Sequence, residues 1–172
     1  MDEGGIQERH RQIGTDLFRG AMGMVVGNVS IITAGVKKDR SGMVASSVVS
    51  LSADPPKIIA CINRSSSTWP LIVQYRHLGV SSLAVRHKAI AERFSGFDGT
   101  KGVDRFVGAE WTILETGASL LQDANVILDC ALDEMIDRGT HSIVIGTVVA
   151  ARTRETDDAL VYWRKAYRPL RL

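Results

Sequence analysis

The sequence predicts a mainly β protein, a closed antiparallel barrel with a few short helices. Six or more segments are rich in β-branched or alternating apolar residues, and polar turns separate them. No long helical segment alternates with these strands, as a doubly wound sheet would require. The 172 residues are 45% hydrophobic and 23% charged, which suits one soluble domain with its own core. We therefore expect a flexible arm over residues 1–14 and a single domain over residues 15–172.

The first elements follow from capping residues and turns. Thr15 can cap a short helix whose opening turn carries Asp16, close to the positive end of the helix dipole. Prolines at the end of the second strand force the chain out of it. The expected elements are a helix from Thr15 to Gly23 or Gly27, a strand over 29–34, a hairpin turn over 37–42 and a strand over 43–51.

The next strand, residues 57–63, is apolar at consecutive positions, which indicates burial on both faces. Thr68 can cap a helix over 69–75, with Pro70 in the first turn. The clearest alternation of apolar and polar residues follows at 126–133. The remaining expected elements are a strand over 79–85, a helix over 88–94, a loop over 95–102, an edge strand over 111–114 and strands over 143–150 and 160–162.

Charge and cysteine content exclude several classes of function. The net charge of +2 is small and no basic block occurs, so we expect no nucleic-acid or membrane partner. The polar, acidic N-terminus does not resemble a signal peptide, so a cytoplasmic location is expected. Cys61 and Cys130 are both interpreted as buried packing residues. The four histidines lack the close spacing of metal ligands, so we expect no metal.

Three regions depart from ordinary strand composition. Ser46, Ser47 and Ser50 lie within a predicted strand, where small side chains leave room for a flat ligand beside the backbone. The alternative is an exposed strand face with solvated serines. The segment 63–68 joins a buried strand to a helix start, where free N–H groups and hydroxyls can bind an anion and Arg64 can add charge. The alternative is a polar loop that caps the helix.

The third region combines the turn 139–141 with an aromatic and basic segment, 162–168. His141 can hydrogen-bond or stack on a ligand, although a turn histidine is more often a plain surface residue. Neither the phosphate-binding loop of nucleoside triphosphatases nor the dinucleotide fingerprint is present. No serine-hydrolase motif occurs either.

Several segments, taken together in the order in which they occur along the chain, resemble the flavin reductase family. This family comprises the small NAD(P)H:flavin oxidoreductases that serve two-component monooxygenases. The resemblance extends over residues 18–170. It implies a flavin-binding split β-barrel, a homodimer with flavin near the subunit interface, FMN or FAD as ligand, and NADH or NADPH as reductant. The segments that carry it are Phe18–Gly23, Gly42–Pro56, Cys61–Thr68, Ala91–Gly96, Gly139–His141 and Tyr162–Tyr167.

The resemblance also implies roles for individual residues. Those expected beside the isoalloxazine ring are Val44, Ala45, Ser46 and Ser47, with Ser50 close by. Those expected to hold the ribityl chain and phosphate are Asn63, Ser65, Ser66 and Thr68. Those expected to border the flavin pocket are Ser82, Leu83 and Phe94. Those expected at the nicotinamide are His141, Arg164 and Tyr167.

The implied activity is hydride transfer from a reduced nicotinamide to flavin, followed by delivery of reduced flavin to a partner monooxygenase. Two alternatives remain. One is a barrel that stores or senses flavin, or reduces another acceptor such as a corrinoid; it is kept open by Thr140, which stands where the family usually has Asp. The other is an interaction domain that binds no flavin and whose serine-rich loops are merely solvated.

Overall fold

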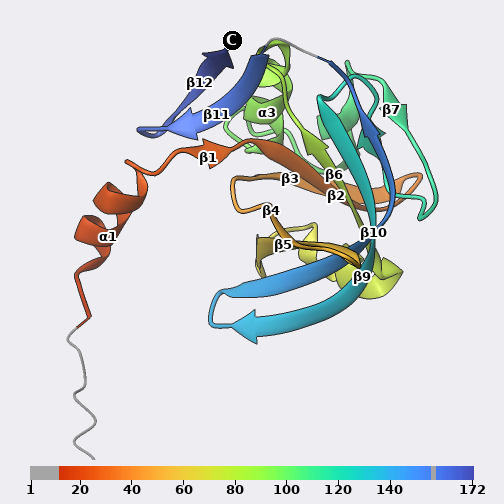
Figure 1. Cartoon of the computed structure of the whole chain (residues 1–172), viewed down its shortest axis with the longest axis horizontal. Coiled ribbons are helices and arrows are strands. Elements are labelled where there is room, and N and C mark those ends of the chain that lie inside the picture. Colours follow the sequence, from red (N-terminus) through yellow and green to blue (C-terminus); the bar gives the residue numbers. More distant parts are fainter. Residues whose placement is uncertain (1–11, 156–157) are drawn as a thin grey trace, which may run out of the picture.

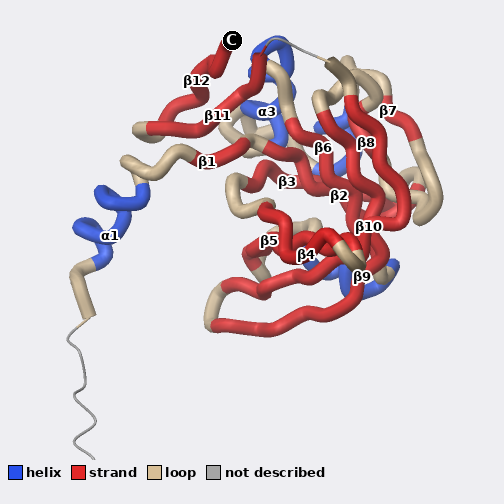
Figure 2. The backbone as a smooth tube through the Cα atoms, in the orientation of Figure 1, coloured by secondary structure: helices blue, strands red, loops and turns tan. Residues whose placement is uncertain are grey.

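Antiparallel strands dominate the computed structural model, which describes residues 12–155 and 158–172 (Figures 1 and 2). Residues 1–11 of the expected arm lie outside the described residues. The largest sheet has seven strands in the order β3-β2-β6-β9-β10-β5-β4. Its strands are β2 (Ser30–Val36), β3 (Asp39–Ala45), β4 (Val49–Ala53), β5 (Pro56–Asn63), β6 (His77–Ser82), β9 (Val126–Arg138) and β10 (His141–Thr153).

Two smaller sheets and a few short helices complete the fold. The three-stranded sheet has the order β1-β11-β12, and β7 pairs with β8. These strands are β1 (Gly27–Asn28), β7 (Trp111–Thr112), β8 (Leu120–Leu121), β11 (Asp158–Trp163) and β12 (Ala166–Arg171). The helices are α1 (Thr15–Met22), α2 (Trp69–Tyr75), α3 (Lys88–Phe94) and the 3₁₀ helices η1 (Val85–His87) and η2 (Gly102–Phe106).

The expectation of a mainly β protein with short helices is confirmed. The seven-stranded ladder begins at β3 and ends at β4, and these two end strands are not paired with each other. A closed barrel is therefore not confirmed by the strand pairing. No helix in the described part of the chain is long and apolar enough to cross a membrane.

The expected single strand over 43–51 is wrong, because the chain changes partner within it. β3 pairs with β2, whereas β4 pairs with β5 at the other end of the ladder. Between the two strands, the Ser47 hydroxyl takes the place of a backbone partner. It accepts a bond from the Cys61 N–H at 3.0 Å and donates to the Cys61 carbonyl at 3.3 Å. The serine-rich stretch therefore ends one strand and directs the chain to the next.

Several boundaries also differ from expectation. The hairpin turn contains only Lys37 and Lys38, and Lys37 has a φ of 52°, so the polar residues that follow belong to β3. β5 is buried on one face only: Ile58, Ala60 and Ile62 are buried, whereas Cys61 is exposed. The interpretation of Cys61 as a core residue is therefore wrong, because period-2 alternation places it on the outer face.

The remaining predictions concern Cys130, the helix boundaries and the capping residues, and only some of them are confirmed. Cys130 is buried as expected, and burial raises the pKa of its thiol to about 12. The helices 69–75 and 88–94 are confirmed at both ends. Thr15 and Thr68 make no side-chain capping bond, since Gly14 occupies the cap position of α1 and Thr68 has a helical backbone. The C-terminal strand β12 was not expected.

The core consists of two clusters on opposite faces of the sheet. Ile31 and Ile32 are both fully buried, yet they belong to different clusters because adjacent strand residues point to opposite faces. The cluster that contains Ile31 includes Phe94 and Phe106, and it lies under α3 and η2. The cluster that contains Ile32 includes Ala45 and Ile62, and it packs β5 and α2 against the sheet.

Candidate functional site

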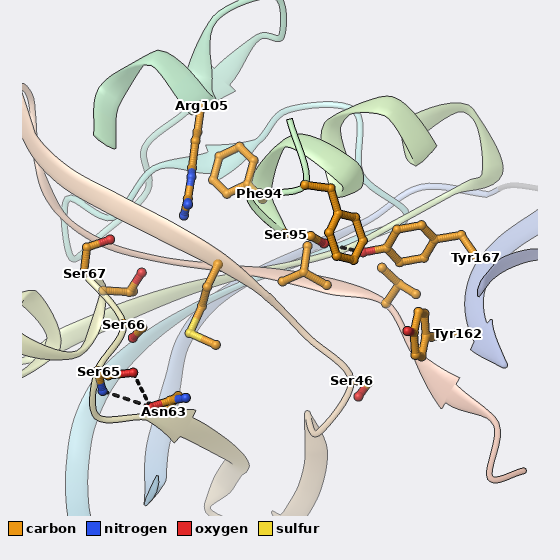
Figure 3. A pocket seen from close by; sticks show the side chains of 15 residues that line it. Ser46, Asn63, Ser65, Ser66, Ser67, Phe94, Ser95, Arg105, Tyr162 and Tyr167 are labelled. Atoms are coloured by element: carbon orange, nitrogen blue, oxygen red, sulfur yellow. Dashed lines mark hydrogen bonds between the residues drawn. The ribbon is translucent and has the colours of Figure 1, made fainter. Parts of the chain in front are cut away.

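A cavity of about 500 Å³ lies where β3, the loop after β5, α3, η2 and the β11–β12 hairpin meet (Figure 3). Its volume is within the range of small-molecule sites. Its wall is made by Val29, Met43, Val44, Ser46, Asn63, Ser65, Ser66, Ser67, Thr68, Phe94, Ser95, Phe97, Arg105, Tyr162 and Tyr167. None of these side chains is a histidine or a carboxylate, so the wall carries no acid or base that titrates near neutral pH.

One end of the cavity is polar and is formed by the loop after β5 (Figure 3). The Asn63 side-chain oxygen accepts bonds from the Ser65 N–H at 2.9 Å and the Ser65 hydroxyl at 2.8 Å. This local bonding folds the loop back on itself. The hydroxyls of Ser67 and Thr68 lie 2.7 and 3.4 Å from the buried Ser41 hydroxyl. Among the described residues the N–H groups of Ser67 and Thr68 have no hydrogen-bond acceptor.

The opposite end is aromatic, with Tyr162 and Tyr167 farthest from the loop (Figure 3). Their ring centroids lie 5.4 Å apart in an edge-to-face arrangement. The Ser95 hydroxyl donates to the Ala91 carbonyl at 2.9 Å, so the Tyr167 hydroxyl is the donor in the 2.5 Å bond between Tyr167 and Ser95. Burial raises the pKa of Tyr167 above its ordinary value, which keeps this donor protonated.

Gly42 explains how Phe94 reaches the cavity wall. A Cβ atom at Gly42 would lie 2.5 Å from the Phe94 ring and 3.0 Å from the Ile32 carbonyl oxygen. Only glycine therefore lets the ring pack directly on β3. The Phe94 ring is buried and also contacts Phe106, with ring centroids 5.1 Å apart. The cavity wall at this point is part of the hydrophobic core.

The structure brings eight of the sequence-predicted residues into this cavity. They are Val44, Ser46, Asn63, Ser65, Ser66, Thr68, Phe94 and Tyr167. Tyr167 was expected at the nicotinamide, and it shares the cavity with the residues expected at the flavin. Segments that are 17 or more residues apart in the sequence thus converge on one space, as the hypothesis of a single ligand requires. Their binding roles remain predictions.

Several predicted residues lie outside the cavity wall. Ala45 and Leu83 are buried in the core, and Ser47 is bonded to the backbone of Cys61. Ser50 is exposed on the edge strand β4. Ser82 is the last residue of β6, where it lies opposite Ser30 and Val126.

The two remaining predicted residues do not line the cavity. His141 is exposed at the start of β10, opposite Asn63, and its Nδ1 lies 2.8 Å from the Thr140 hydroxyl. Arg164 lies in the turn between β11 and β12, where its N–H donates to the Gly23 carbonyl at 2.9 Å. The Arg164 guanidinium stacks over the Trp163 ring, 4.8 Å from the ring centroid.

Seven wall residues were missed: Val29, Met43, Ser67, Ser95, Phe97, Arg105 and Tyr162. Ser67 lies inside the predicted loop and Tyr162 lies within the aromatic segment, so both could have been predicted from the sequence. No local pattern marks Arg105, because its position depends on how η2 folds against β3.

Comparisons with known proteins give a consistent result. The family model of the flavin reductase-like domain matches residues 22–171. The FMN reductase (NADH) RutF of Agrobacterium fabrum is 36% identical over 153 residues, which cover 89% of this chain and 87% of that protein. BorF, the flavin reductase component of a bacterial two-component tryptophan halogenase, is 28% identical, with a TM-score of 0.84 over 92% of this chain and 99% of that one.

A third protein, nitrilotriacetate monooxygenase component B from Mycobacterium thermoresistibile, is 25% identical. Its TM-score is 0.82, and the alignment covers 90% of this chain and 86% of that one. The family model spans most of the chain, and a relative above 30% identity spans nearly all of it. This chain therefore belongs to the flavin reductase-like domain family.

Proposed function

We propose that this chain is an NAD(P)H-dependent flavin reductase that reduces FMN or FAD and delivers the reduced flavin to a partner monooxygenase. One observation carries the proposal: a single cavity joins a hydroxyl- and amide-rich end to an aromatic end, in a member of this family. The similarity to FMN reductases that use NADH favours FMN and NADH as the preferred pair. It does not favour the storage or corrinoid alternatives.

The residues present fit a flavin. The apolar and aromatic part of the wall suits a planar ring system, with Val44 on one strand and Phe94 on the helix that covers it. The loop 63–68 offers hydroxyls and two free N–H groups, which suit a ribityl chain and a phosphate. α2 has only seven residues, so these donors, rather than a helix dipole, are the features that favour an anion here.

Bound flavin supplies the redox chemistry by accepting hydride at N5 from C4 of the nicotinamide. The task of the protein is to orient the two rings and to exclude water from the space between them. Because no carboxylate or histidine lines the cavity, the residues present suit hydride transfer, which needs no general base. We propose that the nicotinamide contacts Tyr167 in the cavity wall together with His141 and Arg164, which lie outside that wall, and that His141 is a positioning residue.

The proposal includes a quaternary structure. We infer a split β-barrel domain over residues 15–172 that forms a homodimer, with the flavin near the subunit interface. α1 extends away from the sheets (Figure 1), and none of its residues is buried. Leu17, Phe18 and Met22 are 66%, 54% and 50% exposed. A second copy would cover this apolar face. Light scattering of the intact chain should give twice the monomer mass, and Phe18→Glu should shift it toward the monomer.

A steady-state assay that combines FMN or FAD with NADH or NADPH tests the activity. We expect oxidation of the nicotinamide only when flavin is present, with free reduced flavin as product. Transfer of that product to a reduced-flavin monooxygenase would be seen as substrate hydroxylation in a coupled assay. No turnover with any of the four combinations would remove the proposal. Tightly retained flavin that NADH reduces too slowly for turnover would favour storage instead.

A further inference from the structure

Arg105 is the only cationic side chain in the described wall of the cavity. Its Nε donates to the Thr100 carbonyl at 2.9 Å, and its Nη1 donates to the Gly42 carbonyl at 2.9 Å. Both acceptors are neutral, and no ion pair in the described part of the chain involves Arg105. A partly buried guanidinium is therefore held in place while its charge is left without a counter-ion.

Arg64 is the cation that the sequence placed in the phosphate loop, but the structure directs it elsewhere. Its Nη2 lies 3.4 Å from the Asp137 carboxylate, and its guanidinium stacks over the Trp69 ring at 5.6 Å. It lines a separate cavity together with Gly139 and Thr140. The charge of Arg64 is thus paired and turned away from the larger cavity.

The position of Arg105 is fixed by the same backbone that supports Phe94. Gly42 accepts the Arg105 bond through its carbonyl, and its missing Cβ leaves room for the Phe94 ring. With Nε and Nη1 engaged, the guanidinium is pre-organised and its Nη2 remains to contact a ligand. Arg105 lies on the same side of the cavity as Ser67 (Figure 3). Arg105, Ser67 and Thr68 thus line one cavity, and the N–H groups of Ser67 and Thr68 make no hydrogen bond that would compete with a ligand.

We propose that Arg105 binds the flavin phosphate and sets the preference of the enzyme for a phosphorylated flavin. The inference rests on the proposed function and extends it to specificity. A partly desolvated cation without a counter-ion strongly favours an anionic ligand over a neutral one. FMN ends in a phosphate monoester that carries nearly two negative charges, as phosphoserine does. Riboflavin has no phosphate, and the corresponding phosphate of FAD carries one charge.

The test compares Arg105→Gln with Arg64→Gln in the intact chain. Binding of FMN, FAD and riboflavin is measured by quenching of flavin fluorescence. We expect Arg105→Gln to weaken FMN binding by about tenfold to a hundredfold, as loss of a charge-assisted hydrogen bond does. The affinity of this variant for FAD should fall by a smaller factor, and its affinity for riboflavin should fall by less than about twofold. Arg64→Gln should leave all three affinities unchanged, and thermal unfolding checks that both variants are folded.

Three results would overturn the inference. Equal weakening of FMN and riboflavin in Arg105→Gln would show that Arg105 only supports the wall. A larger loss of FMN binding in Arg64→Gln would assign the phosphate to the other arginine. FMN binding unchanged in Arg105→Gln would exclude a contact. If Arg105→Gln does not fold, Arg105→Lys is the second variant, because it keeps the charge but cannot bond to both the Thr100 and the Gly42 carbonyls. It should bind FMN more weakly than the wild type and still prefer FMN to riboflavin.

A failure of the proposed function would look different. The wild-type chain would then bind neither FMN nor riboflavin, and no arginine variant would change this. If the wild type binds riboflavin as tightly as FMN, it remains a flavin-binding protein and only the role of Arg105 is lost. The salt dependence gives a further check: FMN affinity should fall with rising ionic strength in the wild type and much less so in Arg105→Gln.

Discussion

The two ends of the cavity are built in different ways. Most of the polar end comes from successive residues in one loop, where Asn63 holds Ser65 by two hydrogen bonds, and Arg105 of η2 adds a charge beside them. The aromatic end is assembled from α3, β11 and β12, and its ring at Phe94 belongs to the hydrophobic core. A change at the polar end should therefore alter affinity alone. A change at the aromatic end should alter the stability of the fold as well.

Phe94→Ala gives the largest expected effect. The side chain is 1% exposed and packs on Gly42 and Phe106, so its removal leaves a cavity within the core. We expect the free energy of unfolding to fall by about 3–5 kcal/mol. Urea denaturation monitored by tryptophan fluorescence measures this.

Phe97 provides a matched control for Phe94. It lines the same cavity but is 75% exposed. Phe97→Ala should lower the free energy of unfolding by less than about 0.5 kcal/mol. If both variants lose the same stability, the aromatic end is not part of the core and the contrast between the two ends fails.

His141→Ala tests a residue outside both ends. The ring is exposed and lies opposite Asn63, beyond the cavity wall. Loss of one ligand contact should raise KM for the nicotinamide by roughly fivefold to tenfold. The Kd for FMN, from fluorescence titration, should change less than about twofold. Weaker FMN binding with an unchanged KM for NADH would place His141 at the flavin instead.

Ser66→Ala is expected to have the smallest effect. Its hydroxyl lines the cavity and accepts the Trp69 N–H at 3.3 Å. Loss of one hydrogen bond to the ligand is worth about 1 kcal/mol, or roughly a fivefold rise in the Kd for FMN. Ser50→Ala is the control, because Ser50 is exposed on β4 and lies outside the wall. Equal effects of the two variants would contradict the assignment of the polar end.

The same contrast explains what could be predicted from the sequence. The polar end depends on neighbouring residues, so Asn63, Ser65, Ser66 and Thr68 were identified from one segment. Strand and helix types followed from local periodicity and held for most elements. Local periodicity did not predict the break between β3 and β4 at residues 46–48. A strand that changes its pairing partner has the same alternation of apolar and polar residues as a continuous strand.

Contacts between segments that are distant in the sequence leave no pattern in the local sequence that would predict them. Arg105 enters the cavity because η2 folds against β3, and its bond to Gly42 joins residues 63 positions apart. Cys61 and Cys130 have similar apolar neighbours, yet only Cys130 is buried. The difference lies in which face of each strand is covered, and this depends on the packing of the whole sheet.

A crystal structure of the protein soaked with FMN tests the central claim most directly. We predict one flavin within the 500 Å³ cavity. Its phosphate should lie within about 3 Å of donors from the loop 65–68 and of the Arg105 guanidinium, and its ring should lie toward Phe94 and Tyr167. FMN bound outside this cavity, or bound with its phosphate beside Tyr167, would contradict the account.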